Sequence, residues 1–148
     1  MTEYVVNEWL WADLARDNGD IARRETFETI AKFAASSDRL ILVAESEFDR
    51  KAWLLCKSPD ITTRRMGAAF IRLIRQNANR CCLVRSGDLF PLPAEISAAV
   101  KPDDHYLVQA CRTFPGSVLV TTDRPLAEIV TTHGIACMER EEFVKTFS

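Results

Sequence analysis

The feature that most constrains the fold is a run of five consecutive apolar residues with charge on both sides. Residues 40–44 read LILVA, preceded by Arg39 and followed by Glu45. A strand with one face in water alternates apolar and polar residues, whereas a strand covered on both faces is apolar throughout. Burial on both faces is typical of parallel sheets that lie between layers of helices. The chain is therefore expected to contain such a sheet.

The order of the other patterns along the chain supports this expectation. Shorter apolar runs with strand character occupy residues 4–6, 81–84, 118–121 and 135–138. The segments between them carry apolar residues at helical spacing. Strands that alternate with helices predict a three-layer α/β/α sandwich with a mostly parallel sheet, a Rossmann-like architecture. We expect one domain over residues 1–148.

Composition excludes several classes of protein. Hydrophobic residues make up 47% and charged residues 27% of the chain, which is ordinary for a soluble globular domain. No apolar run approaches the roughly 18 residues that cross a bilayer, and the first residues lack the basic region of a secretion signal. We therefore expect a cytoplasmic protein that does not bind membranes. The five cysteines form no C-x-x-C pair, so buried free thiols are favoured over zinc ligands or disulfides.

The stretch KPDDHYLVQAC contains two adjacent aspartates, Asp103 and Asp104, directly before an amphipathic helical pattern. Aspartate is a preferred helix N-cap because its carboxylate accepts a hydrogen bond from a free N–H of the first turn. One aspartate is enough for that purpose. The second therefore calls for another explanation.

Polar residues also follow the expected strands. They are Asn7 and Glu8, then Glu45 and Glu47, then residues 121–123. Ligands of parallel sheets bind beyond the carboxyl ends of the strands, near the point where the strand order reverses. Asp103, one turn before the apolar face of its helix, is expected to point to the same edge. Carboxylates gathered without a balancing lysine are electrostatically costly, and Mg²⁺ or Mn²⁺ bound by oxygen ligands would offset that cost.

The stretch DDHYLVQAC, followed shortly by VLVTTDRPL, resembles the C-terminal half of PIN-domain ribonucleases. In that family an aspartate with a polar neighbour precedes an apolar helix that ends in alanine. A strand then ends in Thr-x-Asp with a leucine three residues later. The matching residues here are Asp103, Asp104, Ala110, Thr121, Asp123 and Leu126. The resemblance extends over the whole chain in the order of elements and implies a single PIN-like domain.

The resemblance also implies a function. PIN-domain ribonucleases hydrolyse RNA with a water molecule activated by bound Mg²⁺ or Mn²⁺. It implies that Asp103 and Asp123 are metal ligands and catalytic residues, and that Thr121 supports the site through a hydrogen bond. Asp104 is either a further ligand or the helix cap. Many members are toxins of bacterial toxin–antitoxin pairs and commonly dimerise, so an RNA substrate, an antitoxin or other protein partner, and a homodimer are expected.

The chain departs from the family pattern at two positions. Where the family has its first aspartate this chain has Asn7, whose amide oxygen can coordinate a cation but brings no charge. Glu8 could compensate as a catalytic carboxylate if the strand end is bent. The middle glutamate is Glu45, Glu47 or Asp49, and Glu45 is favoured because it lies closest to the strand end.

These departures keep a second interpretation open. The chain could be a catalytically degenerate PIN-like module that binds RNA or a protein partner without cleavage. On that interpretation Asp103 and Asp123 serve only as helix caps, and Glu8 and Glu45 are solvated carboxylates.

A stripe of arginines is a candidate nucleic-acid surface. At about 100° per residue its members fall within roughly one quarter of a helix circumference. Arginine forks bind phosphate well, so the stripe could contact an RNA backbone. The alternative is an ordinary solvated face. The residues are Arg64, Arg65, Arg72 and Arg75.

Overall fold

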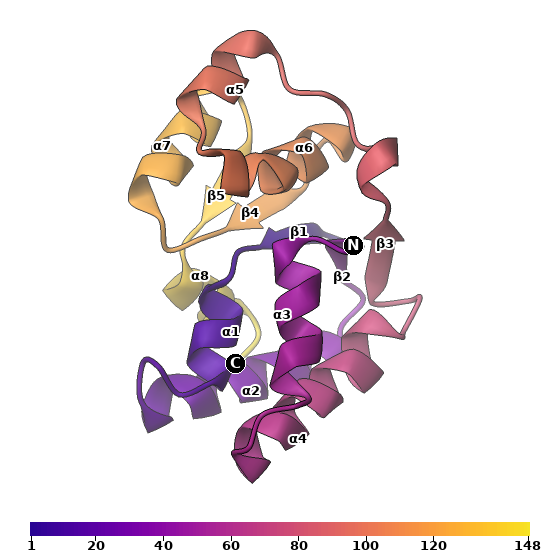
Figure 1. Ribbon diagram of the computed structural model, residues 1–148. Helices are drawn as coiled ribbons and strands as arrows, with labels where there is room; N and C mark the ends of the chain where they lie inside the picture. The colour runs from indigo at the N-terminus through magenta and orange to yellow at the C-terminus, as the bar shows by residue number, and fades with distance from the viewer.

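The computed structural model describes residues 1–148 and contains one five-stranded sheet in which every strand is parallel to its neighbours. The spatial order is β3-β2-β1-β4-β5. The predicted three-layer α/β/α architecture is confirmed, with an all-parallel sheet (Figure 1). The strands are β1 (Glu3–Val6), β2 (Arg39–Val43), β3 (Cys81–Val84), β4 (Val118–Val120) and β5 (Ala136–Met138).

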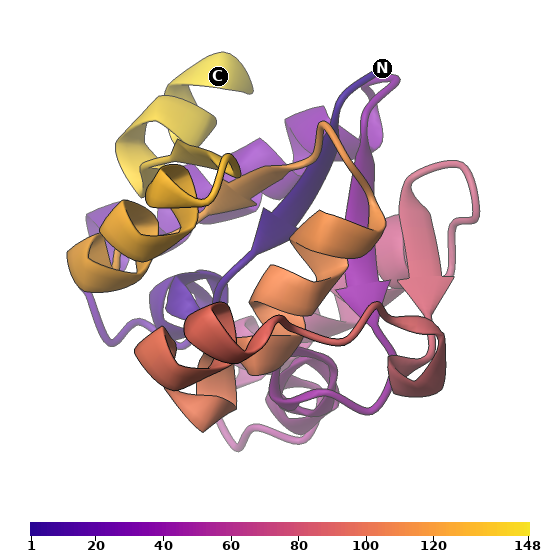
Figure 2. The ribbon, with the colours of Figure 1, turned by 90° about the horizontal axis from the view of Figure 1, so that it is seen from above.

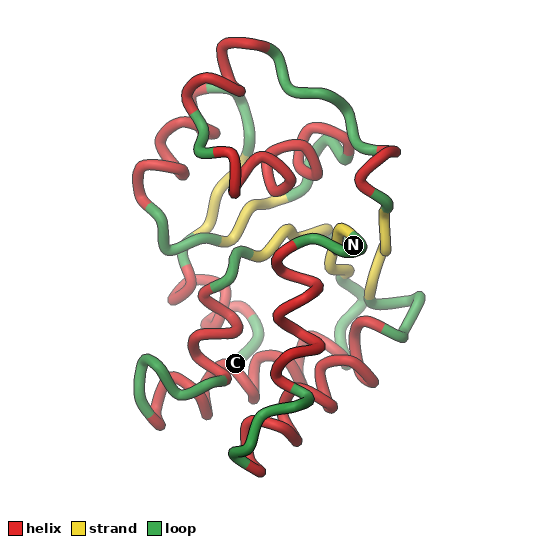
Figure 3. Tube along the Cα trace, in the orientation of Figure 1, coloured by secondary structure: helices red, strands yellow, loops and turns green.

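Helices cover both faces of the sheet (Figures 1 and 3). One layer contains α1 (Trp9–Leu14), α2 (Asp20–Ala34), α3 (Glu47–Leu55), α4 (Ile61–Phe70) and α8 (Arg140–Thr146). The opposite layer contains α5 (Ala94–Ala99), α6 (His105–Thr113) and α7 (Arg124–Thr132). A π-helical turn, η1 (Ile71–Arg75), extends α4, and two short 3₁₀ turns are η2 (Ser86–Asp88) and η3 (Pro102–Asp104). None of the helices combines the length and apolar character needed to span a bilayer.

The strands are apolar throughout because each face of the sheet lies in its own core. Along β1, Tyr4 and Val6 belong to the core beneath α1 to α4 and α8, while Val5 belongs to the core beneath α5 to α7. In β2, Leu42 and Ile41 divide between the two cores in the same way. Full burial of one such side chain stabilises the fold by about 1.5–3 kcal/mol.

The C-terminal helix α8 is fastened to the first strand and to α1. The ring of Phe143 meets the ring of Tyr4 edge to face, with centroids 5.1 Å apart. The Nε of Arg140 donates to Asp13 Oδ2 at 2.7 Å, and Asp13 is only 1% exposed. Thr26 of α2 donates to the same oxygen at 2.7 Å. These contacts hold α1, α2 and α8 as one layer.

The strand order places a topological switch point at the centre of the sheet. The chain builds outward from β1 to β2 and β3, then returns through α5, η3 and α6 to add β4 on the other side of β1. Figure 2 shows α6 lying across the sheet along this return path. The carboxyl ends of β1 and β4 are therefore neighbours, at the position where such sheets bind ligands.

Gly67 of α4 packs closely against the end of α3. A Cβ built at this position would lie 2.8 Å from the Cβ of Leu55 and 3.1 Å from the backbone nitrogen of Cys56. Real Cβ atoms do not approach so closely, so any larger residue would push the two helices apart.

We predict that Gly67→Ala lowers the free energy of unfolding by about 1–2 kcal/mol. Overpacking costs about 1–3 kcal/mol, and the better helix propensity of alanine recovers at most about 1 kcal/mol. Urea denaturation measures the change. Gly87→Ala is the control, since nothing lies within 4 Å of its added Cβ and little change is expected. A Gly67→Ala variant as stable as the parent would contradict this account of the α3–α4 contact.

Candidate functional site

The side chain of Asn7 links the carboxyl ends of β1 and β4. Its Nδ2 donates to Thr121 Oγ1 at 3.0 Å, and its Oδ1 accepts the backbone N–H of Glu8 at 2.7 Å. Thr121 Oγ1 also accepts the backbone N–H of Asp123 at 3.1 Å. The amide of Asn7 is thus engaged on both sides, and it holds the two strand ends in register. We call Asn7, Glu8, Asp104, Thr121 and Asp123 the switch-point site.

Asp104 is the member of the aspartate pair that faces this site. It is half-buried, whereas Asp103 is exposed. Burial, and then the negative charges of Asp123 and Glu8, raise the pKa of the Asp104 carboxyl above its ordinary value. Its side chain makes no hydrogen bond to the start of α6, so helix capping does not explain it.

The sequence pattern had placed Asp103 at the sheet edge by extending the α-helical spacing back from Leu107. In the structure Pro102–Asp104 is a 3₁₀ turn, which advances about 120° per residue instead of 100°. The helical spacing therefore does not continue through the two aspartates, and Asp104 takes the position expected of Asp103.

Asp123 combines two functions. Its Oδ1 accepts the N–H of Leu126 at 3.1 Å and caps α7, which confirms the cap predicted for this residue. No hydrogen bond or ion pair occupies its second carboxylate oxygen. Asp123 can therefore offer one oxygen to a ligand while it keeps the helix start in place.

Glu8 is paired with a lysine that the sequence pattern did not indicate. Lys51 Nζ, from α3, lies 3.0 Å from Glu8 Oε2, and the two side chains are 40% and 34% exposed. The expectation of carboxylates without a balancing lysine therefore does not describe the site fully. One of its acids already has a cation.

The three candidates for the middle acid have different surroundings. Glu45 is exposed, has a left-handed backbone with φ of 63°, and its side chain makes no hydrogen bond or ion pair. Asp49 is 3% exposed and accepts from Arg75 Nε at 2.6 Å and from the Glu45 N–H at 2.9 Å. Asp49 thus closes the turn after β2, and its charge is neutralised. Glu47, half-buried on α3, is paired with Arg50, and its charge is among those that raise the pKa of Tyr106.

Tyr106 on α6 is buried beside the acids of the site, and their charges change the pKa of its hydroxyl. Burial, followed by the charges of Glu8, Asp104 and Glu47, raises the Tyr106 pKa far above its ordinary value. Its hydroxyl is buried and makes no hydrogen bond of full geometry, although the backbone of Phe48 lies near enough to lower its pKa. The phenol therefore keeps its proton and remains a donor beside the acids.

Two residues near the site were missed by sequence reasoning, Lys51 and Tyr106, while Glu47 was one of the three candidates for the middle acid but not the favoured one. The spacing of Glu47 and Lys51, four residues apart on one helix, places them on the same face and was a usable signal. Nothing in the sequence joined Lys51 to Glu8, which lies 43 residues away.

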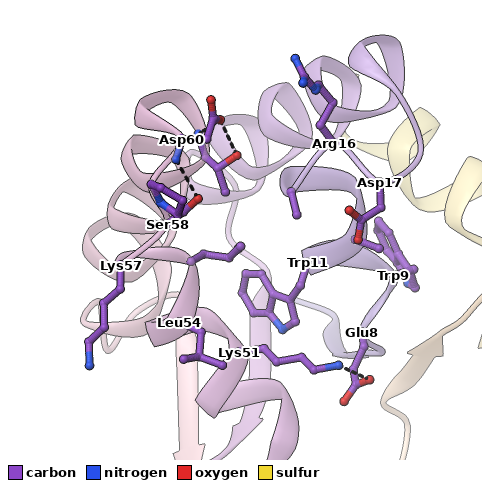
Figure 4. A pocket seen from close by; sticks show the side chains of 15 residues that line it. Glu8, Trp9, Trp11, Arg16, Asp17, Lys51, Leu54, Lys57, Ser58 and Asp60 are labelled. Atoms are coloured by element: carbon purple, nitrogen blue, oxygen red, sulfur yellow. Dashed lines mark hydrogen bonds and ion pairs between the residues drawn. The ribbon is translucent and has the colours of Figure 1, made fainter.

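A cleft of about 850 Å³ opens between α1 and the end of α3 (Figure 4). Glu8 is the only acid of the switch-point site in its lining. The Lys51 side chain reaches across from α3 toward Glu8, below the ring of Trp11 in this view. The indole Nε1 of Trp11 is buried without a hydrogen-bond partner. The rest of the wall mixes apolar residues with charges of both signs.

The switch-point site contains carboxylate and amide oxygens, the type of ligand that Mg²⁺ or Mn²⁺ prefers. The acids approach one another closely enough to perturb the Asp104 pKa. In this conformation, however, no three His, Cys, Asp or Glu side chains gather tightly enough to hold a metal ion.

The arginine stripe is divided between two surroundings. Arg65 and Arg72 are exposed and form no ion pair. Arg64 is exposed and donates to the Ser58 carbonyl at 3.1 Å. Arg75 is committed to buried Asp49, with Nε–Oδ1 at 2.6 Å, and lies over the Trp53 ring at 5.3 Å from its centroid. Arg75 therefore fastens α3 to η1, and the first three remain available to phosphate.

Comparison of the chain with protein-family models, with curated proteins and with solved structures gives no significant match. Its function is therefore inferred from its own residues and their geometry.

We predict that Asp104→Asn becomes more stable than the parent protein as pH rises from about 4 to 7. A carboxyl whose folded pKa is raised loses stability as pH increases through that pKa, and asparagine carries no such charge. The gain should stay below about 1 kcal/mol because the carboxyl is partly solvated. Urea unfolding at both pH values measures it. Asp103→Asn, at the exposed neighbour, should follow the parent at both, and a gain shared by the two variants would contradict the assignment.

Proposed function

We propose that the chain is a metal-dependent endoribonuclease whose Mg²⁺ or Mn²⁺ is held mainly by Asp104 and Asp123. The observation that supports this most strongly is the excess of negative charge around Asp104, a half-buried carboxylate with no hydrogen bond of its own. The position also supports it, since the carboxylates lie at the switch point between β1 and β4. The resemblance to PIN-domain ribonucleases implies Asp123 as a ligand, and it implies Asp103 as the other ligand with Asp104 as a possible further one.

The residues around the acids have separate functions in this proposal. When bound, the metal ion supplies an activated water and stabilises charge on a phosphate. Asn7 and Thr121 keep the two strand ends together and so fix where Asp123 begins. Tyr106 offers a protonated hydroxyl beside the acids. Glu8 is a further carboxylate of the site, and in this conformation it forms an ion pair with Lys51.

The proposed substrate is RNA, with its backbone held by arginine. Arg64, Arg65 and Arg72 lie exposed on α4 and η1 and present guanidinium groups suited to phosphate. An antitoxin or other protein partner and a homodimer remain predictions from the resemblance.

We predict that Asp104→Asn and Asp123→Asn each abolish Mn²⁺-dependent cleavage of RNA and weaken Mn²⁺ binding by at least about tenfold. Each removes one carboxylate charge from a site with few others, and a tenfold loss corresponds to about 1.4 kcal/mol. Calorimetric Mn²⁺ titration and cleavage of a mixed RNA pool measure the two effects.

The matched control is Asp103→Asn, which removes the same charge from the exposed neighbour in the sequence. It should retain both Mn²⁺ binding and cleavage, and circular dichroism should show all three variants folded. Loss of activity in Asp103→Asn with full activity in Asp104→Asn would reverse the assignment of the two aspartates. Equal Mn²⁺ binding in all variants would refute the proposed metal site.

A second candidate function is a PIN-like module that binds RNA or a protein partner without cleavage. The specific observation in its favour is Asn7, which brings no charge and whose amide is engaged with Thr121 and the Glu8 N–H. On this candidate the site lacks one carboxylate that hydrolysis requires.

We predict that Asn7→Asp strengthens Mn²⁺ binding and raises cleavage, or creates it where the parent shows none. The fold tolerates the change, because an aspartate oxygen can still accept the Glu8 N–H while the hydroxyl of Thr121 donates to the other oxygen. Asn77→Asp, in the turn after η1, is the control for added charge. Weaker Mn²⁺ binding by Asn7→Asp would show that the amide, not a carboxylate, is what the site uses.

A further inference from the structure

Trp53 on α3 is the tryptophan that the core does not bury. It is 41% exposed, whereas Trp9 and Trp11 are 7% and 4% exposed and belong to the core beneath α1 to α4 and α8. A single exposed apolar side chain is ordinary on a protein surface. What distinguishes Trp53 is that cations surround it and that one of them fixes its ring.

Arg75 of η1 holds the Trp53 ring from one side. Its guanidinium carbon lies over the ring, 5.3 Å from the centroid. The same guanidinium is anchored to Asp49, with Nε–Oδ1 at 2.6 Å and Nη2–Oδ2 at 3.1 Å. The two side chains of this pair are only 18% and 5% exposed. The ring is therefore fixed by a guanidinium that is itself held in place, and the exposed part of the ring can accept a second flat group.

Further cations flank Trp53 on its own helix. Arg50 and Lys57 lie three and four residues away, a spacing that places them on the same face of α3, and both are exposed. Arg50 pairs with Glu47, and Lys57 forms no ion pair.

The neighbouring helix adds two more cations. Its α4 segment packs against the end of α3 and continues into η1 (Figure 1). Arg72 lies three residues before Arg75 in η1, is exposed and forms no ion pair. Arg64 donates to the Ser58 carbonyl at 3.1 Å, which places it beside the chain that leaves α3. The ring of Trp53 thus lies on a surface whose unpaired charges are positive.

We propose that Trp53 is a stacking platform for a base of single-stranded RNA, and that the cations around it hold the adjoining phosphates. Single strands expose the flat faces of their bases, which stack on aromatic rings, while positive charge binds their backbone. In a duplex the bases remain stacked on one another, and recognition uses shape and backbone instead. This inference rests on the proposed function, because it names the form of RNA that the protein takes.

The platform lies on a helix that starts at the functional edge of the sheet. Helix α3 begins at Glu47, shortly after the carboxyl end of β2, and β2 is the neighbour of β1 in the sheet. Trp53 lies six residues farther along α3, which is roughly 9 Å along the helix axis. A strand of RNA stacked on Trp53 can therefore extend toward that edge.

The first test is the affinity for a fluorescein-labelled oligouridine of about 12 nucleotides, measured by anisotropy in EDTA so that divalent cations and cleavage are absent. Trp53→Leu keeps an apolar side chain but removes the ring, and it should weaken binding about tenfold, or about 1.4 kcal/mol. Trp53→Phe keeps a ring and should bind nearly as the parent does. Leu54→Ala removes the exposed neighbour and should leave the affinity unchanged.

Tryptophan emission measures the contact itself. Since Trp9 and Trp11 are buried, a stacked base should quench only the emission of Trp53. Oligouridine should therefore quench the parent but not Trp53→Phe, and an RNA duplex of the same length should quench neither. Polyglutamate, which carries charge without bases, should quench neither. Equal quenching of the parent and Trp53→Phe, or equal affinity of the parent and a folded Trp53→Leu, would overturn the inference.

The outcomes separate this inference from the proposed function when Mn²⁺-dependent cleavage is measured beside binding. If the parent cleaves RNA and Trp53→Leu binds and cleaves equally well, the inference fails and the proposed function stands. If the parent binds single-stranded RNA through Trp53 but cleaves none, the inference stands and the proposed hydrolysis fails. If the parent binds no RNA, both are overturned, and binding of polyglutamate through Trp53 would then assign the surface to an acidic protein.

Discussion

The pairing of β4 with β1 is the interaction on which the candidate site depends. Their register sets Val6 opposite Val120, so that Asn7 and Thr121 emerge side by side and can hydrogen-bond. This contact joins positions 114 residues apart and brings Asp123 next to the end of the first strand. The return path through η3 then delivers Asp104 to the same place. Without that strand order the acids would lie on separate edges of the molecule.

Charge balance at this point explains why the individual residues differ from one another. Asp104 and Asp123 add negative charge, and burial together with the charge of Asp123 raises the pKa of Asp104. Asn7 limits the charge by being neutral, and Lys51 cancels that of Glu8. The site is therefore acidic around Asp104, while one of its carboxylates is paired with a lysine.

Most of the fold follows from the sequence, because apolar strands and amphipathic helices are local patterns. The site is less predictable, for physical reasons that differ from residue to residue. Asp103 and Asp104 exchange their expected positions because a 3₁₀ turn interrupts the helical spacing. Arg75 does not belong to the exposed arginine surface, because it is paired with buried Asp49, which is distant in the sequence. Lys51 joins the site through a tertiary contact with Glu8 that no local pattern encodes.

The most direct test of a metal site at the switch point is paramagnetic broadening of backbone amide signals by substoichiometric Mn²⁺ in a ¹⁵N-labelled sample. The account predicts that the signals of Glu8, Asp104 and Asp123 broaden first, because those amides belong to the site. Broadening centred on Glu45 or Asp49, or spread evenly over the surface acids, would contradict it.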